Sequence, residues 1–263
     1  MFIRSERSIK EFFQLYPIVS WIVIINLALW LIISLLHLPI GETIYMYGTG
    51  NNYLISQGEY WRLITPIFLH GGLTHVLFNS FSLVLFGPAL EQMLGKFKFI
   101  VAYLVAGFAG NLGTYLLGPE HPFYSHVGAS GAIFGLFGIY LYMIFLRKDL
   151  MDQSSSQIIL VIAGIGVFMT FLQPNVNIYG HIFGLIGGLA IAPLILVNAV
   201  PYWAARVRQS RPKHNDGTVS FDPNRWNKKR RIPRLPSHVK KRILWIVLGG
   251  LVVLGLLNMV GII

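Results

Sequence analysis

The sequence predicts an all-α fold, a polytopic bundle of membrane-spanning helices, and three observations support this prediction. Of the 263 residues, 54% are hydrophobic and only 12% are charged, whereas about a quarter of a soluble domain is charged. Several apolar stretches approach the roughly 20 residues that cross a bilayer as a helix. The basic residues are confined to some of the intervening loops. We therefore expect lipid, rather than water, to surround most of the chain.

Seven stretches are apolar and long enough, or nearly long enough, to span a membrane. The first is long and is not followed by a small-residue cleavage site, so we expect an uncleaved anchor rather than a signal peptide. The fifth is the shortest. The stretches are Val19–Leu38, Ile67–Leu90, Phe99–Leu117, Val127–Leu146, Ile158–Leu172, Ile178–Val200 and Ile243–Ile263.

The basic residues predict the orientation of these spans. With seven spans, 20 of the 21 Lys and Arg residues fall on one side of the membrane, and only Arg62 falls on the other. Cytoplasmic loops of membrane proteins carry such an excess of positive charge. We therefore expect a cytoplasmic N-terminus and a C-terminus outside.

The chain is expected to have four parts. These are a cytoplasmic segment (1–18), a six-helix core (19–200), a basic cytoplasmic linker (201–242) and a seventh transmembrane helix (243–263). The linker contains the run NKKRR, which could bind nucleic acid. An anchor that fixes topology and touches anionic headgroups explains the same charges. We expect the anchor, and no nucleic-acid partner.

Polar groups inside the apolar stretches are few, and they are the candidates for function. The chain has no cysteine, which excludes a thiol nucleophile and thiolate metal sites. None of the seven stretches contains Asp or Glu, but His70 and His75 lie in the second and His181 in the sixth. Ionisable groups within a membrane are expensive and are functional candidates by default.

A serine and two histidines are expected at similar depth, because the second, fourth and sixth stretches run in the same direction. Ser130 and His181 are each the fourth residue of their stretch, about 5 Å below the outer surface at about 1.5 Å per residue. His75 is the ninth residue of its stretch, about 12 Å deep, and Asn79 lies one turn further. Individually, such residues are often packing groups or bond their own backbone.

Small residues make the combination more specific. Gly184 and Gly188 form a GxxxG pattern, which lets helices approach closely. Close approach of the fourth and sixth helices is what a hydrogen bond between Ser130 and His181 requires.

Five motifs, in order, resemble the rhomboid intramembrane serine proteases. GASG (Gly128–Gly131) resembles the GxSG nucleophile motif, and HVLFN (His75–Asn79) resembles the HxxxN motif. GHIFGLIGG (Gly180–Gly188) resembles the sixth-helix motif with its base histidine. GEYWR (Gly58–Arg62) resembles the Trp-Arg element of the first loop, and LEQMLG (Leu90–Gly95) resembles the end of the second helix.

The resemblance implies a role for each matching residue. Ser130 would be the nucleophile and His181 the general base, in a dyad without an acid. His75, Asn79 and the Ser130 backbone N–H would form the oxyanion hole. Supporting positions would be Gly128, Gly131, Phe134, Gly184, Gly188, Trp61 and Arg62. Family members often have Tyr at the position of Phe134, where an aromatic ring packs on the base histidine.

The resemblance also implies a substrate class and a location. The expected fold is a rhomboid-like six-helix core plus one C-terminal helix, in a bacterial cell membrane. Transmembrane proteins with small or helix-destabilising residues near the cut would be cleaved close to the outer face. We expect no cofactor and no metal. By analogy, the fifth stretch and the loop Gln173–Asn177 are candidates for a moving gate.

Other kinds of intramembrane protease match the sequence less well. An aspartyl intramembrane protease needs two Asp within its spans, and a zinc protease needs HExxH, which HGGLTH (His70–His75) does not match. A metal bound by His70, His75 and His181 is an alternative. So are a transporter and, most seriously, an inactive rhomboid-like protein that binds or escorts membrane proteins. Relatives of that last kind usually lack the serine or the histidine.

Overall fold

The structure of the chain is a computed structural model that describes residues 6, 8–174, 176–202, 204 and 205. The chain divides into two compact units, Met1–Gln209 and Ser210–Ile263, and all that follows concerns the first. Most of the predicted basic linker, the seventh helix and the C-terminus lie outside the described residues. The described part is helical, with one isolated β-bridge between Gly50 and His126.

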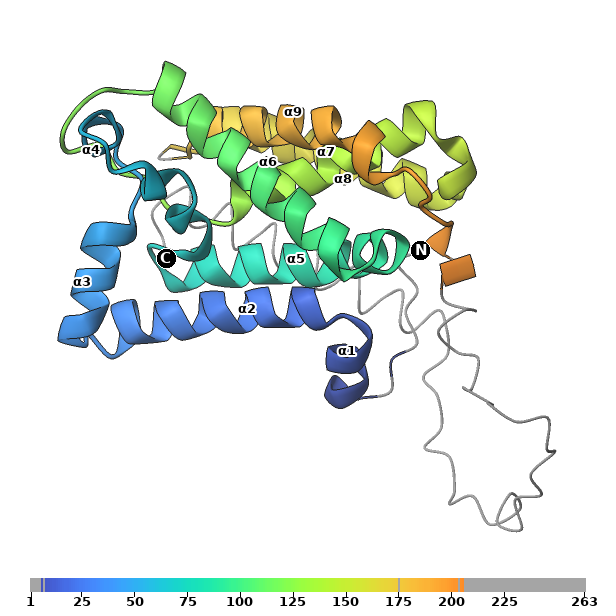
Figure 1. The fold of residues 1–263 in the computed structure, drawn as a ribbon, viewed down its shortest axis with the longest axis horizontal. Helices are drawn as coiled ribbons and strands as arrows, with labels where there is room; N and C mark the ends of the chain where they lie inside the picture. The colour runs from blue at the N-terminus through green and yellow to red at the C-terminus, as the bar shows by residue number, and fades with distance from the viewer. Residues whose placement is uncertain (1–5, 7, 175, 203, 206–263) are drawn as a thin grey trace, which may run out of the picture. The chain divides into compact units, whose positions relative to one another are not determined.

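The described residues form a series of α-helices joined by loops, with a few short 3₁₀ turns and one π-helical segment among them (Figure 1). The α-helices are α1 (Ile9–Leu15), α2 (Pro17–Trp30), α3 (Pro39–Gly48), α4 (Asn52–Ser56), α5 (Leu73–Leu94), α6 (Lys96–Leu117), α7 (Ser130–Leu146), α8 (Gln153–Leu172) and α9 (Ile178–Ile195). A π-helical segment, η1 (Leu31–Leu35), continues α2. The 3₁₀ turns are η2 (Tyr60–Leu63), η3 (Thr65–Phe68) and η4 (Lys148–Leu150).

Helix α7 is the centre of the bundle. It packs against α6, α9, α8 and α5, and most of its side chains are buried, from Ala132 to Tyr140 without a break. A helix that is apolar on all sides is expected to be enclosed by others. Figure 1 shows α2 and α5 side by side, with α6, α7, α8 and α9 grouped beyond them. The first residue of α7, Ser130, is therefore held by the most enclosed helix of the core.

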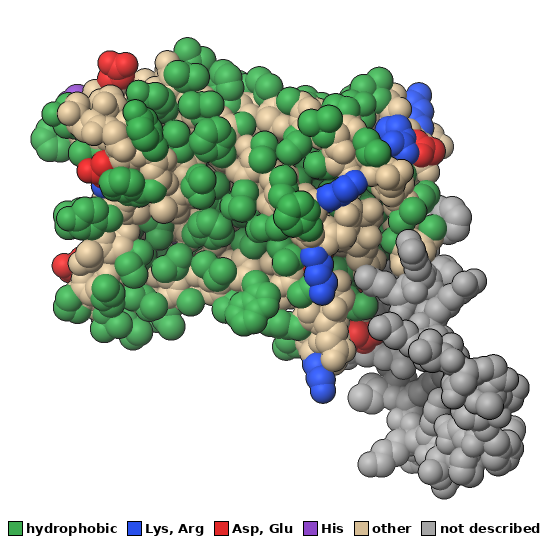
Figure 2. Space-filling view, viewed as in Figure 1, with side chains coloured by type: hydrophobic (Ala, Val, Ile, Leu, Met, Phe, Trp, Pro, Cys, Tyr) green, Lys and Arg blue, Asp and Glu red, His purple; other side chains and the backbone are tan. Residues whose placement is uncertain are grey.

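The outer faces of the helices are apolar, which identifies an integral membrane protein. Five helices are long and apolar enough to cross a bilayer: Pro17–Leu35, Leu73–Leu94, Lys96–Leu117, Gln153–Leu172 and Ile178–Ile195. Helix α7 is apolar but shorter, with 17 residues. Large apolar side chains such as Trp21, Val161 and Leu194 are more than half exposed, and hydrophobic side chains dominate the face in Figure 2. Water would not favour such a surface, but lipid does.

Basic side chains collect at one end of the bundle, at the right of Figure 2. Lys98 Nζ donates hydrogen bonds to the carbonyls of Ile195 and Val197, at 3.1 and 2.6 Å. Arg147 donates to the carbonyl of Leu196 at 3.4 Å. These carbonyls lie at the C-terminus of α9, where the helix dipole favours positive charge. The loop charges predicted on one side therefore also stabilise a helix end.

Several of the predicted span boundaries are wrong, and three of the starts are wrong for local reasons. Ile67 and Phe68 belong to a 3₁₀ turn, and α5 begins only at Leu73, so His75 is the third residue of its helix. Val127–Ala129 precede α7, and the amide of Gly128 bonds the carbonyl of Pro66. The fifth helix is not short, because Asp152 caps it at Gln153. With these corrections, His75 lies in the first turn of its helix, as Ser130 and His181 do in theirs.

The expectation that no carboxylate lies within a span is also wrong. Helix α5 runs past Leu90, so Glu91 lies inside it and is buried. Its two carboxylate oxygens accept the backbone N–H groups of Ile18 and Val19, each at 2.9 Å. It thereby caps the first turn of α2, whose amides have no partner within their own helix. His75 lies about 24 Å away along α5, at about 1.5 Å per residue, so Glu91 does not act on the candidate site.

Glycines let α7 and α9 touch through their backbones. A Cβ atom added to Gly184 would lie 2.1 Å from the carbonyl oxygen of Gly131, and one added to Gly188 would lie 1.9 Å from that of Gly135. No real Cβ atom approaches an oxygen so closely, and the obstacle is backbone, which cannot rotate away. The GxxxG pattern therefore fixes the distance between the two helices.

We predict that Gly188→Ala destabilises the protein, because the new methyl group must push α9 away from α7. Overpacking of this kind costs about 1–3 kcal/mol, and the melting temperature in detergent measures it. Gly164→Ala on α8 is the matched control, since no atom of the described residues lies within 4 Å of its added Cβ. It should be neutral or stabilising, because Ala favours helix by about 1 kcal/mol over Gly. Equal melting temperatures for the two variants would contradict the backbone contact.

Candidate active site at the first turns of α5, α7 and α9

The predicted serine and histidines all lie in the first turn of a helix, at the same end of the bundle. Ser130 is the first residue of α7, His75 the third of α5 and His181 the fourth of α9. The first turns of α7 and α9 adjoin, because a Cβ on Gly131 would lie 3.0 Å from the carbonyl oxygen of Gly180. Residues far apart in sequence are thus brought together by helix packing.

Gly128 brings His75 and Ser130 around one backbone position. Its φ is +133°, and a Cβ placed on it would lie 2.6 Å from His75 Nε2 and 3.7 Å from Ser130 Oγ. Only glycine adopts such a backbone conformation without strain. The imidazole of His75 therefore occupies the space beside the serine that any other residue at 128 would fill.

The ring of His181 is held on one face and at one nitrogen. It stacks on Phe134, with ring centroids 4.1 Å apart and an angle of 16° between the planes. Its Nδ1 lies 2.8 Å from the hydroxyl oxygen of Thr170 on α8. No hydrogen bond joins the ring to Ser130 in the described part of the chain. Catalytic hydrogen bonds are often long without substrate and tighten when it binds.

Asn79 lies one turn below His75 and is buried. Its amide nitrogen donates to the carbonyl of His75 at 2.9 Å. An amide nitrogen carries two hydrogens, so one remains after this bond. The bond holds the Asn79 side chain along α5 on the side of the first turn.

His70 lies next to the site, although the sequence suggested it only as a possible metal ligand. It is fully buried. Its Nε2 accepts a hydrogen bond from the backbone N–H of Ala129, with 3.4 Å between the two nitrogens. Its ring meets that of His75 edge-on, with centroids 5.0 Å apart. It therefore supports the residue that precedes Ser130. Among the described residues, no group of three His, Asp or Glu side chains is arranged to hold a metal ion.

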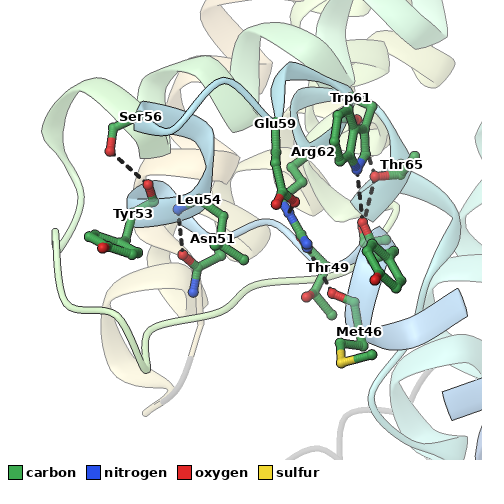
Figure 3. Close-up of polar contacts among 12 residues, drawn as sticks. Met46, Thr49, Asn51, Tyr53, Leu54, Ser56, Glu59, Trp61, Arg62 and Thr65 are labelled. Atoms are coloured by element: carbon green, nitrogen blue, oxygen red, sulfur yellow. Dashed lines mark hydrogen bonds and ion pairs between the residues drawn. The ribbon is translucent and has the colours of Figure 1, made fainter. Parts of the chain in front are cut away.

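In the described part of the chain, the side-chain hydrogen bonds of Trp61 and Arg62 stay within the first loop, residues 39–66 (Figure 3). Arg62 is 2% exposed. Its Nε bonds the Glu59 carboxylate at 2.6 Å, and its Nη1 donates to the carbonyls of Met46 and Thr49 at 2.9 and 2.7 Å. Trp61 Nε1 donates to the carbonyl of Tyr47 at 3.0 Å. A buried guanidinium is tolerated only when it is paired and bonded in this way.

The first loop in turn holds the segment that leads to Ser130. Gly50 and His126 exchange two backbone hydrogen bonds, both 2.9 Å long. The Asn51 amide donates to the carbonyls of Pro122 and Tyr124, at 2.7 and 3.1 Å. The chain therefore enters α7 along a path fixed by Gly50, Asn51 and Pro66.

Comparison with known proteins matches residues 57–198 to the rhomboid domain family, over more than half of the chain. The YdcA protein of Bacillus subtilis is 47% identical over 194 residues, which cover 73% of this chain and 94% of YdcA. The chain belongs to the rhomboid family. The rhomboid protease GluP of Bacillus subtilis is 40% identical over 151 residues, 57% of this chain and 29% of GluP. A chloroplast rhomboid-like protein 9 of Arabidopsis thaliana is 31% identical over 169 residues, 62% of this chain and 37% of that protein.

This rhomboid domain includes the three first turns, since residues 57–198 contain His75, Ser130 and His181. The similarity to rhomboid proteases supports an intramembrane protease.

His126 makes the entry to α7 sensitive to acid. Its ring is buried against Gly50, and neither ring nitrogen has a hydrogen-bond partner among the described residues. Burial disfavours the charged ring and lowers the pKa of His126 to about 4. The unfolded chain takes up this proton near pH 6.5. Protonation of His126 therefore does not reduce the free energy of unfolding above pH 6.5. The free energy of unfolding falls as the pH drops from 6.5 to about 4.

We predict that His126→Leu removes part of the acid sensitivity of folding. The pKa difference corresponds to about 3 kcal/mol of unfolding free energy. Denaturant unfolding in detergent at pH 7.5 and pH 4.5 should show a smaller loss for the variant than for the wild type. His121 lies in the same loop but is exposed, so His121→Leu is the control and should behave as the wild type. An unchanged pH dependence in His126→Leu would contradict the assignment.

Proposed function

We propose that this rhomboid protein is a serine endopeptidase that cleaves transmembrane segments with a dyad of Ser130 and His181. The observation that carries the proposal is the placing of both residues in the first turns of α7 and α9, two helices in backbone contact. A serine hydroxyl is a weak nucleophile until a neighbouring base takes its proton. The neutral imidazole of His181 is the base that the site offers.

The surroundings of Ser130 suit the negative charge that develops during acyl transfer. The residue begins α7, whose first N–H groups have no partner within the helix and point toward the helix start. The positive end of the helix dipole lies there too. His75, beside Gly128, and the remaining amide hydrogen of Asn79 add two side-chain donors. We assign the oxyanion to these three groups.

The proposed substrate is a membrane protein whose helix unwinds locally near the outer face. A helical segment hides its scissile carbonyl in backbone hydrogen bonds, so small or helix-breaking residues near the cut favour the reaction. Hydrolysis also requires water at Ser130. A cytoplasmic N-terminus, as the basic residues predict, puts the first turns of α5, α7 and α9 near the outer surface. The serine and the histidine are both present, which disfavours an inactive protein that only binds or escorts its partners.

We predict that Ser130→Ala and His181→Ala each abolish cleavage of a model transmembrane substrate by the purified protein. Because the two residues act as one unit, the double variant should be about as inactive as either single variant. All three should keep the wild-type melting temperature within a few degrees. Substantial cleavage by Ser130→Ala would rule out the serine mechanism, whereas a wild type that binds but never cleaves would favour the escort function.

A second prediction separates an oxyanion role of Asn79 from a packing role. Loss of an oxyanion donor slows turnover by about a hundredfold or more and leaves substrate binding and melting almost unchanged. Loss of a packing bond within a membrane, worth about 0.6 kcal/mol on average, lowers melting and spares turnover. We expect the first pattern for Asn79→Ala and a similar one for His75→Ala.

Asn111 supplies the contrast for this test. It is a buried asparagine on α6 whose amide donates to the carbonyl of Leu63 at 3.0 Å. Asn111→Ala should lower the melting temperature, because the Leu63 carbonyl loses its partner. If Asn79→Ala instead melts early and turns over normally, the Asn79 amide is structural.

A further inference from the structure

Helix α8 contacts the rest of the bundle along one narrow face, and a polar residue ends that face. Its buried residues are Ser155, Ile159, Ala163 and Thr170. Large side chains on its other faces, such as Val161 and Phe168, are more than 60% exposed. Thr170 is 2% exposed and lies in the last turn, against His181. Burying a hydroxyl at this contact requires partners for it.

The hydroxyl of Thr170 has two partners at equal distance. Its oxygen lies 2.8 Å from the backbone carbonyl of Gly166 and 2.8 Å from Nδ1 of His181. A carbonyl oxygen can only accept, so the one hydroxyl hydrogen must point to Gly166 if that contact is a hydrogen bond. The hydroxyl oxygen then accepts, and Nδ1 of His181 must donate. Both contacts are hydrogen bonds only when the ring proton is on Nδ1.

We propose that Thr170 is a positioning residue that fixes His181 in the tautomer protonated at Nδ1, so that Nε2 keeps a free lone pair. A general base needs that lone pair to take the proton of a serine hydroxyl. In triads a carboxylate holds the other nitrogen, and here a neutral hydroxyl on a neighbouring helix does so. The inference deepens the proposed function and rests on it for the identity of the base.

Two contacts together determine the orientation of the ring. Stacking on Phe134 sets the plane of the His181 ring, and the bond to Thr170 sets its rotation within that plane. Phe134 itself is packed against Gly166, since a Cβ on Gly166 would lie 3.4 Å from its ring. The same turn of α8 therefore supports both the stacking ring and the hydroxyl.

A plain alternative is that Thr170 only bonds its own helix, as buried Ser and Thr often do. The chain contains a matched case. Ser20 on α2 is 3% exposed, and its hydroxyl donates to the carbonyl of Tyr16, four residues earlier, at 2.7 Å. Thr170 bonds Gly166 in the same way, but only Thr170 also contacts a histidine. Ser20→Ala therefore removes a back-bonded hydroxyl without touching His181.

The kinetic test compares Thr170→Val, Thr170→Ser and Ser20→Ala in the full-length protein, with a model transmembrane substrate. Thr170→Val should lower kcat by about tenfold, the effect of one neutral hydrogen bond, with KM unchanged. Thr170→Ser keeps the hydroxyl and should restore most of kcat. Ser20→Ala should keep the wild-type kcat. A Thr170→Ser variant as slow as Thr170→Val, or a Ser20→Ala variant equally slow, would overturn the inference.

A spectroscopic test needs no activity and so separates this inference from the proposed function. Nitrogen-15 NMR of histidine-labelled protein without substrate reports which ring nitrogen of His181 carries hydrogen, with His181→Gln used to assign the signals. We expect a proton on Nδ1 in the wild type and in Thr170→Ser, and a mixture of both tautomers in Thr170→Val. A proton on Nε2 in the wild type, or no change in Thr170→Val, overturns the role of Thr170 even if the protein cleaves. The expected spectra in a protein that never cleaves would uphold the tautomer and refute the protease.

Discussion

The contact between the backbones of α7 and α9 is the constraint on which the rest of the structure depends. Gly184 and Gly188 lie against the carbonyls of Gly131 and Gly135. The distance between the two helix axes therefore leaves no room for even one methyl group at these contacts. Ser130 and His181 are carried on the first turns of these helices. Their separation is thus set by main-chain atoms rather than by flexible side chains. Preorganisation of this kind is what acyl-transfer sites require.

A second layer of contacts fixes what surrounds those two residues. Arg62 gathers the first loop through Glu59 and two carbonyls, and the pairing of Gly50 with His126 carries this order to the segment before Ser130. On the other side, α8 holds His181 through Thr170. The polar groups around the candidate site are therefore supported by the first loop and α8, which contain neither Ser130 nor His181.

The sequence predicted helices α2, α5, α6, α7, α8 and α9 because each corresponds to one long apolar run in the sequence. It predicted that α7 and α9 pack closely because the GxxxG spacing can be recognised in the sequence alone. It missed where α5 and α7 begin, because Ile67 and Val127 are as apolar as helix residues although main-chain bonds to a neighbouring segment set their conformation. It missed Thr170 because one hydroxyl in an apolar run carries no pattern, and only folding shows what it faces. Assignment of the catalytic roles rests on the resemblance and the proposed experiments.

Glu91 has a consequence for how the protein is assembled. The backbone N–H of Ile18 donates to the carboxylate of Glu91, which is 73 positions later in the chain. When the first span has been synthesised, α5 does not yet exist, and the N–H groups at the start of α2 have only water to bond. An unsatisfied N–H is too costly in hydrocarbon for that end to sink into the bilayer. We therefore expect the start of the first span to stay at the aqueous interface until the second span is inserted.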